Sequence, residues 1–394
     1  MNTQTLQKWN KVRLDEIADF QYGYTASSKE DDTGTKLLRI TDIVPDLIDW
    51  ETVPFCDIDE KDAKQYGIKK GDILIARTGA TAGYAKFIRR QPEKSVFASY
   101  LIRLTMKKAD TSSEYVGRII ESDTFKQFVA SHASGSAQPH ANAPILKDFE
   151  FLLPDLKTQV SVANILSVYD DLIENNALRI QILEQIAQAT YTEWFVNLHF
   201  PDHEKVKMTD SGIDFGKIPQ GWTVKKLGEK IDISRGRNIT KETVEEGNIP
   251  VVAGGLEPAY YHSTANTEAP VVTVSASGAN AGFVNLYMEN VWASDCSYID
   301  KGVTPFVLYY FLLLKSRQIE VTGLQRGSAQ PHVYPKDLSA LLVVDVPDHL
   351  LENFEDIVGT IFSFVGNLKK QNKALRDSRN LLLPKLVTGE IIVK

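Results

Sequence analysis

The chain has 394 residues, which is too long for one typical hydrophobic core and predicts two or more domains. Its 43% hydrophobic and 24% charged residues are ordinary for a globular protein and exclude a disordered or fibrous chain. The formal net charge of −7, taken as a sum, argues against a nucleic-acid partner.

Features that place a protein in the cell are few in this sequence. No apolar run is long enough to cross a bilayer, and the opening MNTQTLQKWNK lacks the hydrophobic core of a signal peptide. Cys56 and Cys296 lie far apart and outside any CxxC spacing, so we expect neither a disulfide framework nor a cysteine zinc site. These features predict a cytoplasmic protein without membrane contact.

Charge is segregated along the first part of the chain. Residues 1–63 carry 7 basic and 14 acidic side chains, whereas residues 64–108 carry 11 basic and 2 acidic ones. The basic segment would give either one cationic face suited to DNA or a solvated surface of strands and loops with mixed charges. The charge pattern alone leaves both interpretations open.

The first region, residues 1–155, is predicted to be rich in β-structure. Short apolar segments such as GDILIART and SYLIRL are bounded by Gly, Pro, Asn and Asp, which is typical of strands joined by turns. Between them lies the Gly-rich stretch TGATAGY at Thr78–Tyr84. It does not match G-x-G-x-x-G and no βαβ unit surrounds it, so a dinucleotide site is not expected.

A long helix is predicted to follow, over residues 156–200. No Gly or Pro occurs between Thr158 and Asn197, and apolar residues recur at steps of three and four. The expected stripe consists of Ile165, Leu172, Ile173, Ile180, Leu183, Ala187 and Trp194. A helix of about 38 residues within this span is about 57 Å long and needs a partner for its apolar side. The next segment, 201–220, is polar with Gly and Pro, and we expect a linker.

The region 221–347 repeats the pattern of the first region. WNKVRLDEIADFQYG at Trp9–Gly23 resembles WTVKKLGEKIDISRG at Trp222–Gly236, and TGATAGY resembles SGANAGF at Ser277–Phe283. VFAS and VWAS follow in the same order, and a Lys-Asp pair, an apolar run and Pro-Asp close both regions. Matching motifs in matching order predict a two-fold internal repeat whose halves differ in loop length.

A second long helix with a C-terminal tail is predicted over residues 348–394. Its apolar positions are Phe354, Ile357, Ile361, Val365, Leu368, Leu375 and Leu382. Each long helix is the obvious partner of the other, so we expect a coiled coil. Asn176 and Asn372 fall in or beside the stripes, where each either fixes the register from a buried position or lies exposed on a flank.

The hexapeptide GSAQPH occurs twice, at Gly135–His140 and Gly327–His332. As a catalytic element it would use its Ser and His as nucleophile and base, but no nucleophile elbow is present and no acid recurs to orient the histidine. Gly-Ser before and Pro after are typical of a turn. A structural turn is favoured over a DNA contact, with catalysis far behind.

Other catalytic signatures are missing from the sequence. Pro45-Asp46 with Asp62-Ala63-Lys64 matches a nuclease pattern only loosely and has no counterpart in the second half. A Walker loop, the Asn/Asp-Pro-Pro-aromatic tetrapeptide of amino-methyltransferases and a zinc-binding spacing among the 7 histidines are also missing. The sequence therefore predicts a binding protein.

The chain resembles the specificity subunits of type I restriction–modification systems. The resemblance covers essentially all residues and rests on the repeat, the helix end EQIAQATYTEWFVN, the linker GKIPQGW and the tail LLPKLVTGEI. It implies an α+β fold with two β-rich target-recognition domains at 1–155 and 221–347. The two long helices would pair antiparallel as a coiled coil, and the whole chain would form a pseudo-two-fold repeat.

The resemblance also implies function and partners. Each recognition domain would read one half of a split site in double-stranded DNA, and two unlike domains imply an asymmetric site. The helices would set the spacing between the halves and dock two methyltransferase subunits, which restriction/translocase subunits join. S-adenosylmethionine, ATP and Mg²⁺ would be bound by those partners, so no cofactor is expected in this chain.

The predicted DNA-contacting side chains lie in LLRITDI, in ARTGATAGY and in the loops at the matching positions of the second region. In the first domain they are Arg39, Thr41, Asp42, Arg77, Thr78, Thr81, Lys86, Arg89 and Arg90. In the second domain they are Arg235, Arg237, Asn238, Ser275, Ser277, Asn280 and Arg326. Arg is the best single reader of guanine, while Lys mainly contacts phosphate. Arg77 and Arg326 stand out because each lies beside a repeated motif.

Two rival hypotheses remain at this point. An orphan or decoy adaptor would bind methyltransferase subunits without directing modification, but its loops would have lost the polar and basic tips that are present here. An enzyme fused to its own recognition domains would need the catalytic motifs that are missing.

Overall fold

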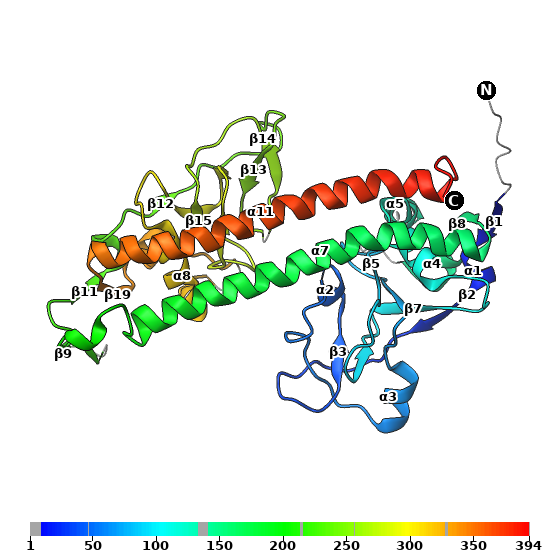
Figure 1. The fold of residues 1–394 in the computed structure, drawn as a ribbon, viewed down its shortest axis with the longest axis horizontal. Helices are drawn as coiled ribbons and strands as arrows, with labels where there is room; N and C mark the ends of the chain where they lie inside the picture. Colours follow the sequence, from blue (N-terminus) through cyan, green and yellow to red (C-terminus); the bar gives the residue numbers. More distant parts are fainter. Residues whose placement is uncertain are drawn as a thin grey trace. The chain divides into compact units, whose positions relative to one another are not determined.

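The computed structural model describes residues 9–45, 47–132, 141–212, 216–255, 257–327 and 330–393 (Figure 1). The chain forms two compact units: unit 1 comprises residues 1–178 and 370–394, and unit 2 comprises residues 179–369. The sequence predicts five consecutive spans, each made of one continuous stretch of chain. The compact units instead combine one β-rich region each with parts of both long helices.

The β-rich region of unit 1 contains eight strands and six short helices among its described residues. The strands are β1 Asn10–Arg13, β2 Ala18–Tyr22, β3 Lys36–Leu38, β4 Ile73–Ala76, β5 Ala85–Phe87, β6 Ser95–Phe97, β7 Leu101–Met106 and β8 Glu150–Leu153. The helices are α1 Leu14–Ile17, α2 Ile40–Ile43, α3 Glu60–Tyr66, α4 Ser113–Ile120, α5 Asp123–His132 and α6 Ala143–Lys147.

An antiparallel sheet with the strand order β2-β7-β4-β5 is the centre of unit 1. All four residues of β4 are buried, which explains its continuous aliphatic sequence ILIA. Two smaller pairs accompany the sheet: β3 lies parallel to β6, and β1 lies antiparallel to β8. The predicted segments GDILIART and SYLIRL are the neighbouring strands β4 and β7.

Unit 2 contains the remaining strands and helices α8 to α10. The strands are β9 Met208–Asp210, β10 Lys217–Pro219, β11 Thr223–Lys226, β12 Ser234–Arg235, β13 Ile249–Val252, β14 Tyr260–His262, β15 Val271–Ser275, β16 Val284–Tyr287, β17 Trp292–Ala293, β18 Cys296–Asp300 and β19 Leu342–Asp345. The helices are α8 Val307–Ser316, α9 Gln318–Gly323 and α10 Pro335–Ser339.

The sheet topology of unit 2 repeats that of unit 1. The order β12-β18-β15-β16 matches β2-β7-β4-β5, the parallel pair β13-β17 matches β3-β6, and β11-β19 matches β1-β8. The glycine that ends each Trp-to-Gly motif is packed alike, because an added Cβ would lie 2.2 Å from Ala98 O at Gly23 and 2.2 Å from Ser294 O at Gly236. The predicted α+β fold with an internal repeat is confirmed.

The two long helices are α7, Leu156–Tyr191, and α11, Asp348–Val387, and they pack together (green and orange to red in Figure 1). A π-helical turn, Thr192–Val196, extends α7. Within unit 1 the helices run antiparallel, since Asn176 lies opposite Asn372 while Asp170 lies opposite Arg379. Asn176 Nδ2 donates to Asn372 Oδ1 at 2.9 Å and both side chains are buried, so the register interpretation holds.

The expected apolar stripe of α7 is only partly buried. Ile173 and Ala187 are buried, but Ile165 is exposed and Leu172 is 48% exposed; Val162 and Leu166 occupy the core instead. On α11, Ile357 is likewise exposed although Phe354 and Val365 are buried. The helices carry apolar side chains on more than one side, and steps of three and four residues do not tell which side meets the core.

The predicted linker and the C-terminal tail each contribute residues to the core of one unit. The predicted linker forms the hairpin of β9 and β10, and Ile218 belongs to the unit 2 core. Leu383 and Leu386 of the C-terminal tail belong to the unit 1 core. In the described part of the chain, no helix combines the length and apolar character that crossing a membrane requires.

Candidate nucleic-acid interface

The Gly-rich loop of unit 1 connects β4 to β5 and is held rigidly. Gly79 and Gly83 have φ angles of +79° and +89°, which favour glycine over any L side chain. The amide of Gly83 donates to Ala76 O at 2.8 Å, and the amide of Ala141 donates to Arg77 O at 2.8 Å. The residue that follows the first hexapeptide is therefore fastened to the start of this loop.

The Gly-rich loop of unit 2 connects β15 to β16 with the same geometry. Gly278 and Gly282 have φ angles of +79° and +85°. The amide of Val333 donates to Ala276 O at 3.0 Å, which is the counterpart of the bond from Ala141 to Arg77. The repeat predicted from the letters G-A-x-A-G thus extends to individual backbone hydrogen bonds.

The duplicated hexapeptide lies next to this loop where it is described. The first copy and residues 328 and 329 of the second lie outside the described residues. In the second copy, Pro331 O accepts from the amide of Gly278 at 3.1 Å, and the backbone of His332 exchanges two 2.9 Å hydrogen bonds with Arg326. These contacts agree with the structural turn that the sequence favours.

Arg77 lies at the foot of the unit 1 loop among aromatic side chains. Its Nε donates to Ser99 O at 3.0 Å, and its guanidinium is 5.2 Å from the centre of the Tyr22 ring. Tyr22 is exposed and Tyr100, next to Ser99, is 58% exposed. The arrangement presents a cation with stacking surfaces to solvent, which suits bases and phosphates. Thr78 and Thr81 lie half-buried on the loop itself.

Arg39, Thr41 and Asp42 form a separate group around the short helix α2. Asp42 accepts from the backbone amide of Arg39 at 2.7 Å and from its guanidinium at 2.9 Å and 3.1 Å. Thr41 is exposed beside them. The arginine and the carboxylate therefore neutralise each other locally.

The basic residues within and directly after β5 contact other parts of the fold. Arg89 pairs with Asp170 at 2.5 Å and with Asp171 at 3.1 Å, and Arg90 pairs with Glu174 at 3.4 Å, all on α7. Lys86 Nζ donates to Pro45 O at 2.6 Å, and burial lowers the pKa of its ammonium group.

Two further cations of the basic segment are neutralised in the same way. Arg103 pairs with the buried Asp72 at 3.3 Å, and Lys107 pairs with Asp19 at 3.6 Å. Acidic side chains of the segment itself and of other parts of unit 1 thus compensate part of the positive charge that is concentrated between residues 64 and 108.

Arg235 is the central exposed cation of the unit 2 surface. Its guanidinium lies 3.9 Å from Asp295 and 5.6 Å from the centre of the Tyr334 ring. Asp295 also accepts a short hydrogen bond from Ser277 Oγ on the Gly-rich loop. The His332 ring also stacks on the Tyr334 ring, with a centroid distance of 5.8 Å. The Asp295 carboxylate therefore contacts both polar groups.

The other predicted residues of unit 2 differ in exposure. Arg237 and Asn238 are exposed. Arg326 is exposed and pairs with Asp337 at 2.5 Å. Ser275 is buried and donates to Gly254 O at 3.2 Å, and Asn280 Nδ2 donates to the same carbonyl at 3.5 Å. The structure gathers Arg235, Ser277 and Arg326 around the loop and the hexapeptide.

Unlike residues occupy equivalent positions in the two loops. Tyr22 and Arg235 each precede the close-packed glycine, and Tyr100 and Asp295 each follow the repeated Ala-Ser pair. Sequence reasoning missed Tyr22, Tyr100 and Asp295 as candidates. The sequence contains a signal that could have found them. Each of these residues stands directly beside a repeated motif, and the residue type at that position differs between the two halves.

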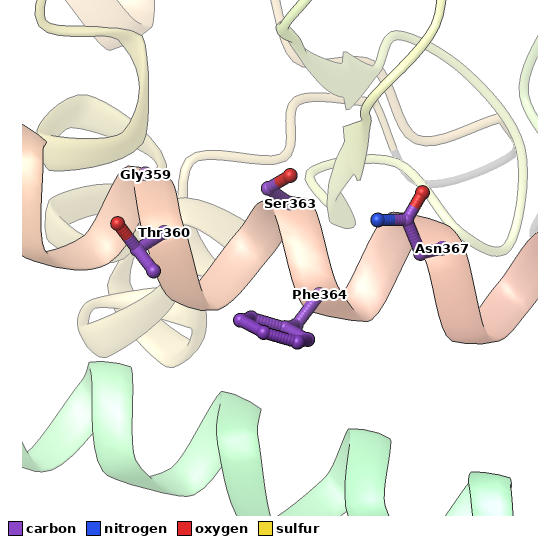
Figure 2. A pocket seen from close by; sticks show the side chains of 5 residues that line it. All are labelled: Gly359, Thr360, Ser363, Phe364 and Asn367. Atoms are coloured by element: carbon purple, nitrogen blue, oxygen red, sulfur yellow. The ribbon is translucent and has the colours of Figure 1, made fainter.

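Metal and thiol chemistry gain no support from the described residues, which contain no group of three or more His, Cys, Asp or Glu suited to a metal ion. Both cysteines are buried, and burial raises the pKa of Cys296 to about 12, which makes its thiol unreactive. An open hollow of about 360 Å³ lies on α11, lined by Gly359, Thr360, Ser363, Phe364 and Asn367 (Figure 2).

Comparisons with known proteins agree with this architecture. The family model of the type I restriction modification DNA specificity domain matches residues 7–185 and 219–374. The MjaIX specificity subunit of Methanocaldococcus jannaschii is 26% identical and aligns over 98% of this chain and 94% of its own length. The HindI specificity subunit of Haemophilus influenzae is 22% identical, over 82% and 87% respectively.

A solved structure shows the same fold. The S subunit of a type I restriction–modification system from M. genitalium superposes with a TM-score of 0.55 at 17% identity, covering 98% of both chains. Two family-model matches, one in each half, coincide with the two loop-bearing regions described above. The chain therefore belongs to the type I restriction–modification DNA specificity family, as a non-catalytic subunit that directs its complex to the target site.

Proposed function

We propose that this subunit reads a two-part, asymmetric site in double-stranded DNA, with the loops of unit 1 contacting one half and those of unit 2 the other. One observation carries the proposal: both units hold the same rigid Gly-rich loop but surround it with unlike side chains. A shared scaffold supports a shared task, whereas unlike polar and aromatic groups support unlike base sequences.

In unit 1 the proposed contacts are Arg77, Thr78 and Thr81, joined by Tyr22 and Tyr100. The stacked, hydrogen-bonded guanidinium of Arg77 is pre-organised for the paired acceptors of guanine. The group of Arg39, Thr41 and Asp42 is a second candidate contact on α2. Lys86, Arg89 and Arg90 already have partners in the fold, so we assign them to holding unit 1 together.

In unit 2 the proposed contacts surround Arg235. Arg237, Asn238, Ser277, Asn280 and Arg326 complete the set, and Asp295 orients Arg235 and Ser277. The buried Ser275 is assigned to the fold because its hydroxyl donates to Gly254 O.

We further propose that the exposed apolar side chains of the long helices dock two methyltransferase subunits. In unit 1 these are Ile165, Val168 and Leu172 of α7; in unit 2 they are Ile182 and Ile186 of α7 and Phe364, which is 60% exposed on α11 beside the hollow of Figure 2. Exposed apolar groups at helical spacing are typical of a protein interface. The presence of one such set in each unit supports two methyltransferase subunits per chain.

The remaining chemistry belongs to the assembled complex. Restriction/translocase subunits would join it, S-adenosylmethionine, ATP and Mg²⁺ would be bound by the partners, and the complex would act in the cytoplasm, where chromosomal DNA is accessible. Adenine methylation at one split motif is the expected product of the complex.

The test is a map of adenine methylation in the native host with and without this gene. We expect methylation to disappear at one split motif whose two halves differ. Unchanged methylation in the deletion strain, while the purified chain still binds methyltransferase subunits, would overturn the proposal in favour of the decoy adaptor.

A further inference from the structure

Three guanidinium groups from separate parts of unit 1 meet one buried carboxylate, that of Asp170 on α7. Arg89, in the segment after β5, lies 2.5 Å from it, and Arg379 of α11 lies 2.5 Å from its other oxygen. Arg118 of α4 makes a still shorter contact. The Asp170 side chain is 8% exposed and that of Arg118 is 3% exposed. The cluster therefore joins the recognition region of unit 1 to both long helices at one point.

Two pairs still join this region to α7 without Asp170: Arg89 with Asp171, which is 67% exposed, and Arg90, which is 75% exposed, with Glu174. Pairs exposed to this degree contribute little to stability. Arg118 also pairs with Glu114 at 3.3 Å and with Glu121 at 3.5 Å, both on or next to its own helix α4. These two carboxylates keep the buried guanidinium paired with negative charge when the recognition region alone is considered. Loss of the Asp170 charge is thus expected to loosen the attachment of this region to the helices more than its internal folding.

Unit 2 attaches its recognition region differently at the corresponding place. Asp170 precedes the buried Asn176 by six residues, and Gly366 precedes the buried Asn372 by six residues. An added Cβ at Gly366 would lie 3.3 Å from Met288 Cβ, in the segment directly after β16. Since β16 corresponds to β5, Met288 occupies the place of the cation Arg89. Side-chain packing in unit 2 replaces the ionic cluster of unit 1.

The cluster is mechanically close to the proposed DNA contacts. The Gly-rich loop ends at Tyr84, and the three residues of β5, Ala85–Phe87, lead from it to the segment that carries Arg89. Strand β5 is paired with β4, which enters the same loop. A tilt of the region about Asp170 is therefore transmitted to the loop by paired strands.

We propose that Asp170 is a positioning residue: it fixes the orientation of the first recognition region on α7 and α11, and with it the spacer length that the complex accepts between the two half-sites. This inference rests on the proposed function, because a spacer exists only if the two units read separate halves of one site. The carboxylate does not contact DNA in this proposal and acts through Arg89, Arg118 and Arg379.

The test uses the complete complex, assembled from methyltransferase subunits and one form of this chain. The three forms compared are the wild type, Asp170→Asn and the control Glu184→Gln. Glu184 lies on the same helix in an exposed pair with Lys369 at 3.2 Å. The substrates are duplexes carrying the mapped site with its natural spacer and with one base pair added or removed, about 3.4 Å of helix axis. The readout is the ratio of methylation rates for natural and altered spacers.

We expect Asp170→Asn to lower this ratio about tenfold, because a looser region tolerates a displaced half-site while serving the natural spacing less well. Glu184→Gln should leave the ratio unchanged. A slower Asp170→Asn complex with an unchanged ratio would mean that the cluster only stabilises the fold, and the inference would be wrong. If the wild-type complex methylates no split site, the proposed function itself fails.

A second variant and a second measurement keep the inference testable if Asp170→Asn does not fold. Arg379→Gln removes only the link to α11, through a side chain that is partly exposed. Hydrogen exchange of the full chain should then be faster around β5 and α4 and unchanged around β16 and α8. Equal exchange around β5 and α4 in Arg379→Gln and in the wild type would overturn the positioning role.

Discussion

Arg77 and Arg235 are cations that the fold holds beside the two repeated loops. Each guanidinium lies over a tyrosine ring, at 5.2 Å from Tyr22 and 5.6 Å from Tyr334. Each also has one polar partner, Ser99 O at 3.0 Å for Arg77 and Asp295 at 3.9 Å for Arg235. Stacking and a fixed acceptor reduce the conformational freedom that an arginine loses on reading a base.

Substituting Arg77→Ala is expected to relax recognition in one half of the target site only. The lost contact to a base should reduce discrimination at one position by about 1–3 kcal/mol, which leaves the other half unaffected. Arg235→Ala should relax the opposite half. Methylation maps from hosts that express each variant measure this, with Arg90→Ala as an exposed arginine control. Relaxation in both halves, or in neither, would contradict the assignment.

Glu355 of α11 is a largely buried carboxylate in unit 2. Its carboxylate accepts from the backbone amides of Leu308 at 2.9 Å and Tyr309 at 3.1 Å, at the N-terminal end of α8. Burial raises the pKa of Glu355 to about 7, although these hydrogen bonds act in the opposite direction. In unit 1 a neutral side chain of α7 has a similar role at the N-terminal end of α4: Gln159 Oε1 accepts from the amide of Ser112 at 2.7 Å.

Because the pKa of Glu355 is higher in the folded chain, the folded state binds more protons and stability should fall as pH rises toward 7. Above that pH the free energy of unfolding should be about 3 kcal/mol lower than at a pH below the ordinary pKa of a glutamate. Glu355→Gln keeps an acceptor oxygen and should remove this slope. Urea unfolding between about pH 5 and pH 8 measures it. Equal slopes in wild type and variant, or the same flattening in the exposed control Glu352→Gln, would contradict the role of Glu355.

At the scale of elements, each recognition sheet depends on one glycine where two chain segments cross. Gly23 follows β2 and Gly236 follows β12, and in both cases the position of a Cβ is filled by the backbone of the neighbouring Ala-Ser segment. Backbone atoms in a buried strand crossing have little room to move aside. The close approach explains why the repeated motif ends in glycine.

Gly23→Ala should destabilise unit 1 by about 3 kcal/mol, because the added methyl would lie 2.2 Å from Ala98 O. Gly236→Ala should have a similar effect on unit 2. Thermal unfolding of the full chain followed by hydrogen exchange assigns each loss to its unit. Gly323→Ala is the matched control, since nothing lies within 4 Å of its added Cβ. A loss as large in the control would show that any Gly-to-Ala change is damaging.

The long helices show what local sequence can predict about an element. Unbroken runs without glycine or proline predict α7 well, and the position of Asn176 in the stripe predicts its burial. The outward direction of Ile165 and Leu172 was not predictable, because the helix has apolar residues on several sides and only the packed neighbours decide which side is covered.

At the scale of the whole molecule, unit 1 is assembled from two distant stretches of chain. Leu383 and Leu386, near the C-terminus, belong to the same core as Phe151 and Leu166. The final turns of α11 therefore complete the unit that begins with β1. Stability of the first recognition region should depend on residues that follow the second one in sequence.

Leu386→Ala should destabilise unit 1 by about 3 kcal/mol, because a fully buried side chain leaves a cavity in this core. The matched control is Leu381→Ala on the same helix, whose side chain is 71% exposed and whose loss should change stability little. Limited proteolysis and thermal unfolding of the full chain are the measurements. Preferential cleavage in unit 2, or equal losses for the two leucines, would contradict this assembly.

Much of the fold was predictable from the sequence because its signals are local. Repeated motifs, turn residues and helical spacing each occupy a few consecutive residues, so the internal repeat, the β-rich regions and the paired helices follow from reading the chain in order. The Gly-rich loops and their neighbours Arg77, Ser277 and Arg235 belong to this predictable part of the candidate site.

Only the tertiary structure decided which charged side chains pair within the fold and which aromatic side chains are exposed to solvent. Arg89 and Arg90 were expected to contact DNA, yet they pair with carboxylates of α7 more than 80 residues further along the chain. Tyr100 was overlooked and is exposed. Sequence by itself determined the elements and their repetition, because these depend on neighbours along the chain. Burial, ion pairing and the outward side of each helix depend on segments that meet only after folding.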